Sequence, residues 1–555
     1  MLKNLDITAG QILRASTHVK RFNNAIRNPR QAQEEKLLQI IRANEDTVYG
    51  KKHGFSKIRS IKDFQTQVPA NKYEDLHPYI EAVKSGQRNQ LTAQQPFMFA
   101  TTSGTTAQPK YIPITELHLK DYTHAFQVHN YQMIVDHPEC AVGKFLIIAS
   151  NDEEGHVDSG VPYGAVSGVL NKRQPSILKH HFSVPYELCK IKDVDMKYYL
   201  MLRIAMAQDV TAVVCCNPSS LLLLADQLKE HQSDLVSDLY DGTVRSQYAP
   251  PAHLADAFGR YLKPNRERAM QLQQLLERTG TLTPQLLWPN LSGLICWKGG
   301  PMSFYLQRLP EYFGDIPVRD FGYMASEGRG SIPLTNDGAG GVVALTSHFF
   351  EFVPEDDVDS VSRTFLTADQ LEVGGRYYIH FTTNSGLYRY DINDLIEVVG
   401  KKENAPVIQF VRKGLGISSI TGEKLTEEQV LVALNLAVRQ LHLDEIAHFT
   451  AEVELGYPPH YVCFAELNAS LPDSMKNEFI RIFDHSLKMQ NPEYADKRST
   501  KRLGMPELRT LPSGTYMRLR QQRVREGAPE AQVKIPLLSS PKSFSQRLAS
   551  LEATY

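Results

Sequence analysis

Residues 97–115 combine hydroxyl side chains, glycine and a lysine in a short loop between two apolar, β-prone runs. Ser103, Thr105 and Thr106 supply hydroxyl groups, and Lys110 places a compact cation at the end of the loop. Hydroxyls, closely approachable backbone amides and an ammonium group are donors that suit a polyphosphate. The pattern GxxxxGK[ST] is absent and a strand follows the loop, an arrangement typical of enzymes that act at an α-phosphate. An ordinary turn is the alternative, but the flanking strands and the Pro-Lys end favour a site for ATP.

A second candidate is the segment from Tyr323 to Gly328, which follows a strand predicted over 318–321. The ring of Tyr323 could stack on adenine, and the Ser326 hydroxyl could bond a phosphate oxygen. The Glu327 carboxylate could hold the Mg²⁺ that neutralises a triphosphate. The simpler alternative is a strand end followed by a capped turn.

A third candidate, residues 388–394, reads Tyr-Arg-Tyr-Asp-Ile-Asn-Asp and leads into an apolar run. Asp394 or Asp391, at the edge of such a strand, could accept both hydroxyl groups of a ribose. Alternatively, Arg389 and Asp391 form a surface ion pair of little energetic value. A fourth segment, Lys-Gly-Gly-Pro at 298–301, exposes backbone against which a flat base could lie.

The order of elements along the chain predicts how these segments are positioned. Between residues 97 and 411, short β-rich runs alternate with longer helical patterns, which predicts an α/β sheet architecture. Residues 1–95 show helical spacing and are predicted to pack as a flank. After a Gly- and Ser-bearing passage, helices at 426–441 and 473–489 and strands at 449–454 and 460–466 predict an α+β tail. We therefore expect an N-terminal domain over 1–412, a hinge at 413–424 and a smaller, mobile C-terminal lid over 425–555.

Composition narrows the possible functions. The chain has 555 residues, of which 42% are hydrophobic, enough to bury more than one domain core. A net charge of −1 gives the chain no overall electrostatic attraction for nucleic acid or an anionic membrane, so neither is an expected partner. The six cysteines show no CxxC pair and no ligand spacing with histidine, as in reduced packing residues of a cytoplasmic protein. No apolar run predicts a membrane span or an export signal.

Together and in this order, the four segments resemble the adenylate-forming superfamily. The closer resemblance is to the auxin-responsive Gretchen Hagen family of acyl acid amido synthetases, and it covers most of the chain. The wider superfamily's coenzyme A ligases carry a lysine after Pro-Ser-Gly near the end, whereas Thr515 follows Gly514 here. Further segments similar to the family's framework are 68–69, 73–80, 349–352, 386–390, 405–406, 409–410, 512–516 and 532–536.

The resemblance implies a role for each matching residue. Ser103, Thr105, Thr106 and Lys110 match the phosphate loop, and Gly299 and Gly300 match the adenine-side loop. Tyr323 matches the adenine position, Ser326 the phosphate position and Glu327 the metal position. Asp394 matches the ribose position, and Lys534 matches the C-terminal catalytic lysine. An exposed lysine beside a proline is the alternative for the last. Three departures point to a bacterial-type member: Ala107 and Asn393 stand where glycines are common, and Leu537 stands where plant members carry arginine.

The implied activity is an acid-amino acid ligation driven by ATP with Mg²⁺. The enzyme would adenylate a carboxylic acid, releasing pyrophosphate, and transfer the acyl group to an amino acid or other amine, releasing AMP. An acyl-coenzyme A synthetase and a non-catalytic nucleotide- or acid-binding homologue are the alternatives. We expect a monomer that acts on small molecules. Four residues could line the acid pocket, with core packing as the alternative: Tyr163, Val166, Ser167 and Val169.

Overall fold

A computed structural model of the chain describes residues 5–102, 110–299, 302–358, 360, 362–414, 416–443, 446, 448–467, 471–525, 536–539 and 541–552. Its contacts form two compact units. The first unit contains residues 5–101 and 111–412, and the second contains Thr102, Lys110 and the described residues from 413 onward. Among the described residues, no helix is long and apolar enough to cross a membrane.

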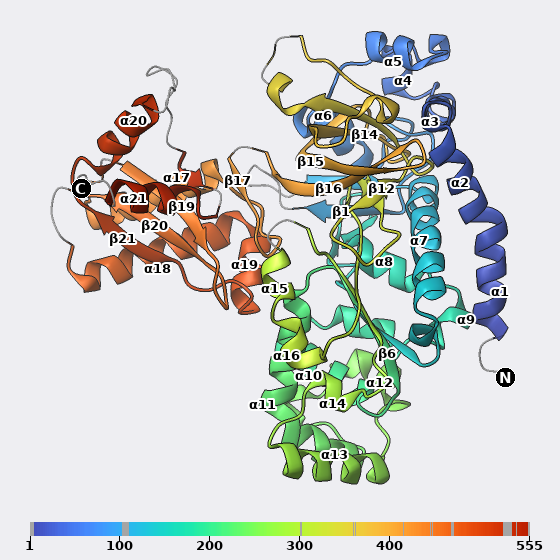
Figure 1. The fold of residues 1–555 in the computed structure, drawn as a ribbon, viewed down its shortest axis with the longest axis vertical. Helices are drawn as coiled ribbons and strands as arrows, with labels where there is room; N and C mark the ends of the chain where they lie inside the picture. The colour runs from blue at the N-terminus through green and yellow to red at the C-terminus, as the bar shows by residue number, and fades with distance from the viewer. Residues whose placement is uncertain are drawn as a thin grey trace. The chain divides into compact units, whose positions relative to one another are not determined.

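The first unit opens with a run of helices that flank its sheets (Figure 1). Helix α3 begins at Pro29, whose fixed φ suits the first helical position, and it buries Leu37, Ile40 and Ile41 at helical spacing. A π-helical turn, Ala15–Val19, separates the first two helices. The run comprises α1 (Leu5–Arg14), α2 (Lys20–Arg27), α3 (Pro29–Ala43), α4 (Val48–Lys52), α5 (Ile61–Gln67) and α6 (Tyr73–Lys84).

Four parallel strands form one sheet of this unit, in the order β3-β6-β7-β8. The apolar sequence of β6, Val-Thr-Ala-Val-Val-Cys, is typical of a parallel strand covered on both faces. The strands are β3 (Lys144–Ile148), β6 (Val210–Cys215), β7 (Gly293–Cys296) and β8 (Val318–Asp320). The helices between them are α8 (Val166–Lys172), α9 (Ser176–Lys179), α10 (Val194–Ala205), α11 (Ser219–Asp241), α12 (Ala255–Gly259), α13 (Arg266–Thr279), α14 (Pro284–Leu287), α15 (Ser303–Leu306) and α16 (Leu309–Phe313).

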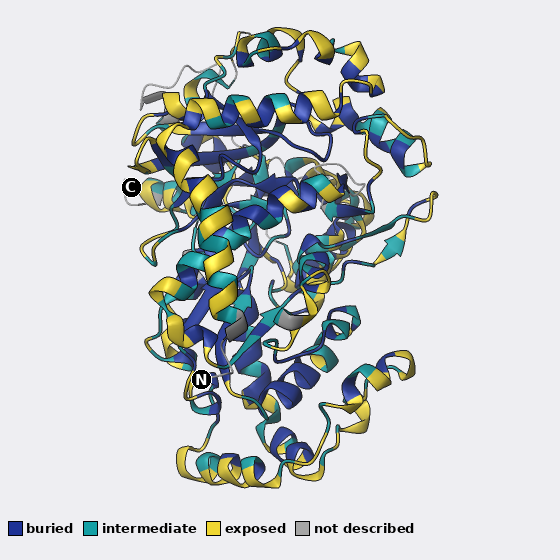
Figure 2. Ribbon diagram, turned by 90° about the vertical axis from the view of Figure 1, so that its right-hand side faces the viewer, coloured by how far each residue is buried: buried dark blue, intermediate teal, exposed yellow. Residues whose placement is uncertain are grey.

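A six-stranded sheet in the order β11-β12-β16-β15-β14-β13 and a smaller sheet in the order β2-β1-β5-β4 complete the first unit. Strands β12, β13 and β14 are almost wholly buried, whereas β16 and the smaller sheet are partly exposed, and Figure 2 shows that the helices expose one face. The elements are β1 (Met98–Thr102), β2 (Lys110–Ile114), α7 (Glu116–Asp136), β4 (Gly155–His156), β5 (Pro162–Gly164), β9 (Met324–Ala325), β10 (Gly328–Arg329), β11 (Ser331–Ile332), β12 (Gly341–Val343), β13 (Phe349–Pro354), β14 (Arg376–Thr382), β15 (Tyr390–Lys402) and β16 (Ala405–Lys413).

The second unit is an α+β fold around the antiparallel pair β19 and β20, with a parallel strand at each edge. The mixed α/β class predicted from the sequence is confirmed. The passage predicted as a hinge, 413–424, contains β17, and within it Glu423 is buried and accepts the Tyr461 hydroxyl. The elements are β17 (Ile417–Ser418), β18 (Leu425–Thr426), α17 (Glu427–Leu441), β19 (His448–Glu454), β20 (His460–Glu466), α18 (Asp473–Gln490), α19 (Pro492–Ser499), β21 (Glu507–Leu511), α20 (Thr515–Arg525), β22 (Leu538–Ser539) and α21 (Ser543–Glu552).

Candidate functional site

Two of the predicted segments follow neighbouring strands of the parallel sheet. The segment with Gly299 leaves the carboxyl end of β7, and the segment with Tyr323 leaves the carboxyl end of β8. Ligands of open α/β sheets bind outside the carboxyl ends of the strands. Gly299 approaches the sheet of β16 closely, because an added Cβ would lie 3.3 Å from the Cβ of Ala339 and 3.5 Å from the Phe410 carbonyl oxygen. The topology therefore brings these two segments to one edge.

Asp320, the last residue of β8, ties these two segments together. Its carboxylate accepts the backbone N–H of Lys298 and the backbone N–H of Gly322, each at 2.6 Å. Burial raises the pKa of this carboxyl to about 6, while the two N–H donors and the Lys298 ammonium oppose the rise. The sequence prediction missed this residue, although a carboxylate at the end of a predicted strand was a usable signal.

Ser326 and Glu327 form the two-residue connection of a β-hairpin. Strands β9 and β10 pair Ala325 with Gly328 and Met324 with Arg329, so the connection lies between them. Ser326 is half-buried, and Glu327 is 4% exposed. The Oε2 atom of Glu327 has no hydrogen-bond partner among the described residues. A buried carboxylate oxygen of this kind can still accept a hydrogen bond or bind a metal ion.

The structure joins Tyr323 directly to Asp394, although the two residues lie in different predicted motifs. The Tyr323 hydroxyl donates to Asp394 Oδ2 at 2.7 Å. Both residues are buried, and burial followed by the negative charge of Asp394 raises the pKa of Tyr323 well above its usual value. The Tyr323 ring stacks on Phe410 of β16, with ring centroids 6.0 Å apart and planes 11° apart. The adenine and ribose candidates therefore belong to one cluster.

The alternative of a surface pair between Arg389 and Asp391 is wrong. Arg389 is 4% exposed and pairs instead with the buried Glu351 of β13, at 2.9 Å. Its guanidinium also donates to the carbonyl oxygens of Gln65 and Val68, which anchors this strand to the N-terminal helices.

Asn393, which precedes Asp394 where a glycine is common, adopts a backbone conformation that favours glycine. Its φ of +58° lies in the left-handed region, which asparagine tolerates better than most residues. Its backbone N–H donates to Asp391 Oδ1 at 2.8 Å, so Asp391 braces the turn.

A stacked histidine pair lies behind the hairpin and was not predicted. His348 Nε2 accepts the backbone N–H of Arg329 at 3.2 Å, directly after Glu327 and Gly328. The ring of His118, near the start of α7, stacks on His348 with centroids 5.3 Å apart and planes 21° apart. Both imidazoles are fully buried, and burial lowers the pKa of each, to about 3 for His118. They therefore support the hairpin as neutral rings.

Of the remaining predicted residues, some are described by the structure and others are not. Lys110 is half-buried at the start of β2. The proposed acid-pocket residues behave mainly as packing residues: Val166 and Val169 belong to the hydrophobic core, Tyr163 lies edge-on to Tyr111, and the Ser167 hydroxyl accepts the Ser150 N–H at 3.2 Å. Five predicted site residues and one departure lie outside the described residues: Ser103, Thr105, Thr106, Gly300, Lys534 and Ala107.

Comparison with known proteins finds relatives along most of the chain. Indole-3-acetic acid-amido synthetase GH3.3 of Arabidopsis thaliana is 27% identical over 539 residues, covering 92% of this chain and 89% of that protein. Jasmonoyl–L-amino acid synthetase JAR4 of Nicotiana attenuata is 25% identical, with coverage of 95% and 94%. The solved structure of the GH3.15 acyl acid amido synthetase matches the fold with a TM-score of 0.66 at 22% identity, covering 95% of each chain.

Family models give the same assignment in three consecutive parts. Residues 18–318 match the GH3 family N-terminal domain, residues 341–413 the GH3 family central domain, and residues 428–543 the GH3 family C-terminal domain. The first of these matches alone covers more than half of the chain, and the resemblance read from the motifs is thereby confirmed. This chain belongs to the GH3 family.

Proposed function

We propose that this chain is an acyl acid amido synthetase that uses ATP with Mg²⁺ to join a small carboxylic acid to an amino acid or another amine. The observation that carries the proposal is the hydrogen bond from Tyr323 to Asp394, which joins the adenine and ribose candidates across 71 residues. The amido synthetases among its relatives support the same activity. The acids named for those relatives differ, so the substrate of this chain is to be found by screening several acids.

The hairpin loop supplies the groups expected at the phosphates. The Ser326 hydroxyl would donate to a phosphate oxygen, and the Glu327 carboxylate would ligate Mg²⁺. The buried Glu327 Oε2, with no partner among the described residues, fits such a metal, because Mg²⁺ is commonly bound by one or two carboxylates together with substrate phosphates. When bound, Mg²⁺ neutralises the charge of the triphosphate. Lys110, with Ser103, Thr105 and Thr106, would hold the other phosphate oxygens.

The proposed reaction has two balanced steps. An oxygen of the acid attacks the α-phosphorus of ATP, forming a C–O–P linkage while the bond to pyrophosphate breaks. The nitrogen of the neutral amine then attacks the acyl carbon and gives up one proton to solvent, forming the amide, and AMP leaves with the linking oxygen. Neither step needs a covalent bond to the protein, so positioning and charge neutralisation carry the catalysis. The lid over 425–555 and the role of Lys534 remain predictions from the sequence.

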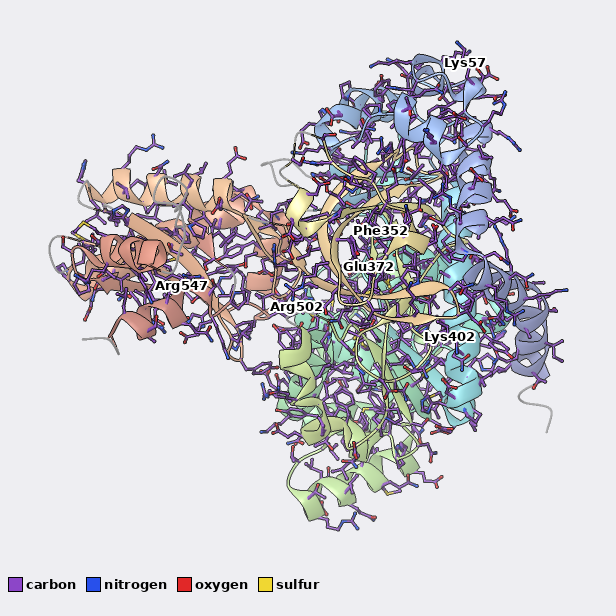
Figure 3. The ribbon with its side chains drawn as sticks, turned by 45° about the horizontal axis from the view of Figure 1, so that its top comes forward. Lys57, Phe352, Glu372, Lys402, Arg502 and Arg547 are labelled. Carbon is purple, nitrogen blue, oxygen red and sulfur yellow. The ribbon has the colours of Figure 1, made fainter. Side chains whose placement is uncertain are left out.

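Exchange between radiolabelled pyrophosphate and ATP tests the first step. We expect exchange that depends on a carboxylic acid, found by screening aryl and alkyl acids. Glu327→Gln should lower the exchange rate about 10²- to 10³-fold, the typical effect of removing one electrostatic contact to the transition state. The matched control is Glu372→Gln, an exposed carboxylate on a loop (Figure 3), which should leave the rate unchanged. Wild-type exchange by Glu327→Gln at saturating Mg²⁺ would refute the metal assignment.

The second step separates the candidate activities. With the acid found by exchange, we expect amide formation with an amino acid, detected by mass spectrometry. A thioester formed when coenzyme A replaces the amine would identify an acyl-coenzyme A synthetase. Binding of ATP without exchange for any acid would identify a non-catalytic homologue.

A further inference from the structure

A polar groove lies between α2 and α3, away from the segments that make up the candidate site. Its volume is about 740 Å³. Figure 1 shows α2 and α3 in blue beside α7 in cyan, within the first unit. Most of the side chains that line the groove carry hydrogen-bond donors, among them Lys20, Arg21, Asn24, Lys36, Gln39 and Thr346.

A buried cation forms part of the groove wall. The Lys36 side chain is 1% exposed, and its ammonium bonds Asp121 Oδ1 at 2.5 Å. The other oxygen of Asp121 accepts the Asn384 side-chain N–H at 2.6 Å, so this carboxylate already has a partner on each oxygen. Burial lowers the pKa of Lys36, Asp121 opposes that change, and the charges of Arg21 and Lys120 add to it. In the described part of the chain, the charged side chains that line the groove are Lys20, Arg21, Lys36 and Glu35, so positive charge exceeds negative charge in its lining.

A buried hydroxyl faces the same groove. Thr346 is 4% exposed and lines the groove, and its Oγ1 has no hydrogen-bond partner among the described residues. Leaving a buried hydroxyl unpaired costs free energy, so the site is complementary to an acceptor atom. Among the described residues that line the groove, Glu35 is the one carboxylate; it is exposed, and its Oε1 accepts the Gln31 side-chain N–H.

We propose that this groove binds a small phosphorylated molecule, with its phosphoryl group held by Arg21, Lys20 and Lys36 and by the Thr346 hydroxyl. Guanidinium and ammonium groups form strong, charge-assisted hydrogen bonds with phosphate oxygens. The volume exceeds that of one phosphate group, which leaves space for the amide side chains to contact the rest of the molecule. Nothing in the proposed ligation chemistry requires this second site.

The groove is also linked to the hairpin through α7. Asp121, the partner of Lys36, precedes Tyr122, whose hydroxyl donates to the Ala325 carbonyl oxygen at 3.1 Å. Ala325 precedes Ser326 of the hairpin loop. An anion that competes with Asp121 for Lys36 therefore acts on a helix that contacts the proposed phosphate-binding loop, and this part of the inference rests on the proposed function.

Calorimetric titration with inorganic phosphate, in the absence of ATP, tests the binding. The double variant Lys20→Gln with Arg21→Gln should weaken phosphate binding about tenfold or more, because two charge-assisted contacts are lost. Thr346→Val, which removes only the hydroxyl, should weaken it about threefold or more. The matched control is Arg42→Gln, an exposed cation on α3 that does not line the groove. Equal binding by the double variant and the wild type would overturn the proposal, as would tighter binding of citrate than of phosphate.

Two further measurements separate this site from the proposed active site. Glu327→Gln should keep phosphate binding even though it loses pyrophosphate exchange, and phosphate bound in the groove should not be displaced by ATP. Displacement of all bound phosphate by ATP would place the anion in the nucleotide site instead. At saturating ATP and acid, phosphate should change the exchange rate of the wild type and not that of the double variant. An equal response in both would overturn the link through α7.

Discussion

Acid should destabilise the first unit through its buried histidines, and His118 allows the effect to be measured. Burial and the nearby Lys36 lower the pKa of His118 to about 3, against about 6.5 in an unfolded chain. Because the folded pKa is the lower one, the stability is fully present above pH 6.5 and is lost progressively as the pH falls toward 3. Between pH 7.5 and 5.5 the unfolded histidine gains nearly one proton, which costs the fold about 1.4 kcal/mol.

Other buried groups in the same unit add to this effect or oppose it. The pKa values of His124 and His129 are also lowered to about 3 by burial, and that of His348 is lowered well below its usual value. These three imidazoles and His118 together should cost about 5 kcal/mol at pH 5.5. Asp320 opposes them by about 1 kcal/mol, because its folded pKa of about 6 lies above the usual value and the folded state gains its proton first.

Urea unfolding followed by tryptophan fluorescence measures this change selectively. Both tryptophans, Trp288 and Trp297, lie in the first unit, so their signal reports its unfolding. His118→Phe keeps a ring against His348 and removes no hydrogen bond to a described residue. The variant should lose about 1.4 kcal/mol less stability than the wild type between pH 7.5 and 5.5. The exposed His253, changed to Phe, is the control. Identical pH dependence of wild type and His118→Phe would refute the reasoning.

Three further outcomes are expected. Asp394→Ala should weaken ATP binding by about 1.5 to 3 kcal/mol, the usual contribution of a hydrogen bond to a charged group. The variant should also bind ATP and 2′-deoxy-ATP equally well. A preserved preference for ATP in equilibrium binding would place the ribose elsewhere. Lys534→Ala should slow single-turnover adenylation while ATP affinity changes little, as for a contact made only in the reacting state; an unchanged rate would leave this lysine without a catalytic role. Gly328→Ala should lower the melting temperature and the exchange rate together, since its Cβ would lie 2.9 Å from the buried His348 Nε2; calorimetry showing an unchanged melting temperature would contradict this steric reading.

The regular elements were largely predictable from periodicity. The predicted helix 473–489 corresponds to α18 (Asp473–Gln490), and the predicted strands 449–454 and 460–466 correspond to β19 and β20. These segments have a strong apolar period, which depends only on neighbouring residues. Contacts between distant residues carry no such local signal. The pairing of Arg389 with Glu351 arises because β13 and β15 both flank β14, and short-range patterns instead suggested its neighbour Asp391.

The candidate site was predictable as a set of segments but not as a structure. Residue types identified Tyr323, Glu327 and Asp394 one by one, because each carries a group that suits one part of a nucleotide. The buried histidines that pack behind these residues could not be predicted from the sequence, for a physical reason. His118 and His348 lie 230 positions apart, and a buried imidazole with few hydrogen bonds has the same sequence appearance as an exposed one.

The two-residue loop that carries Ser326 and Glu327 also constrains how this chain can vary. The base of the hairpin is held by the Tyr323 carbonyl oxygen, which accepts the N–H groups of Gly330 and Ser331 at 2.8 and 3.1 Å. One inserted residue would change the register and turn alternate side chains to the opposite face. Substitutions at the two loop positions can alter the proposed phosphate and metal binding gradually, whereas a change in loop length would abolish it. Homologous sequences should therefore vary freely in residue type around this loop and hardly ever in the number of residues between Tyr323 and Gly330.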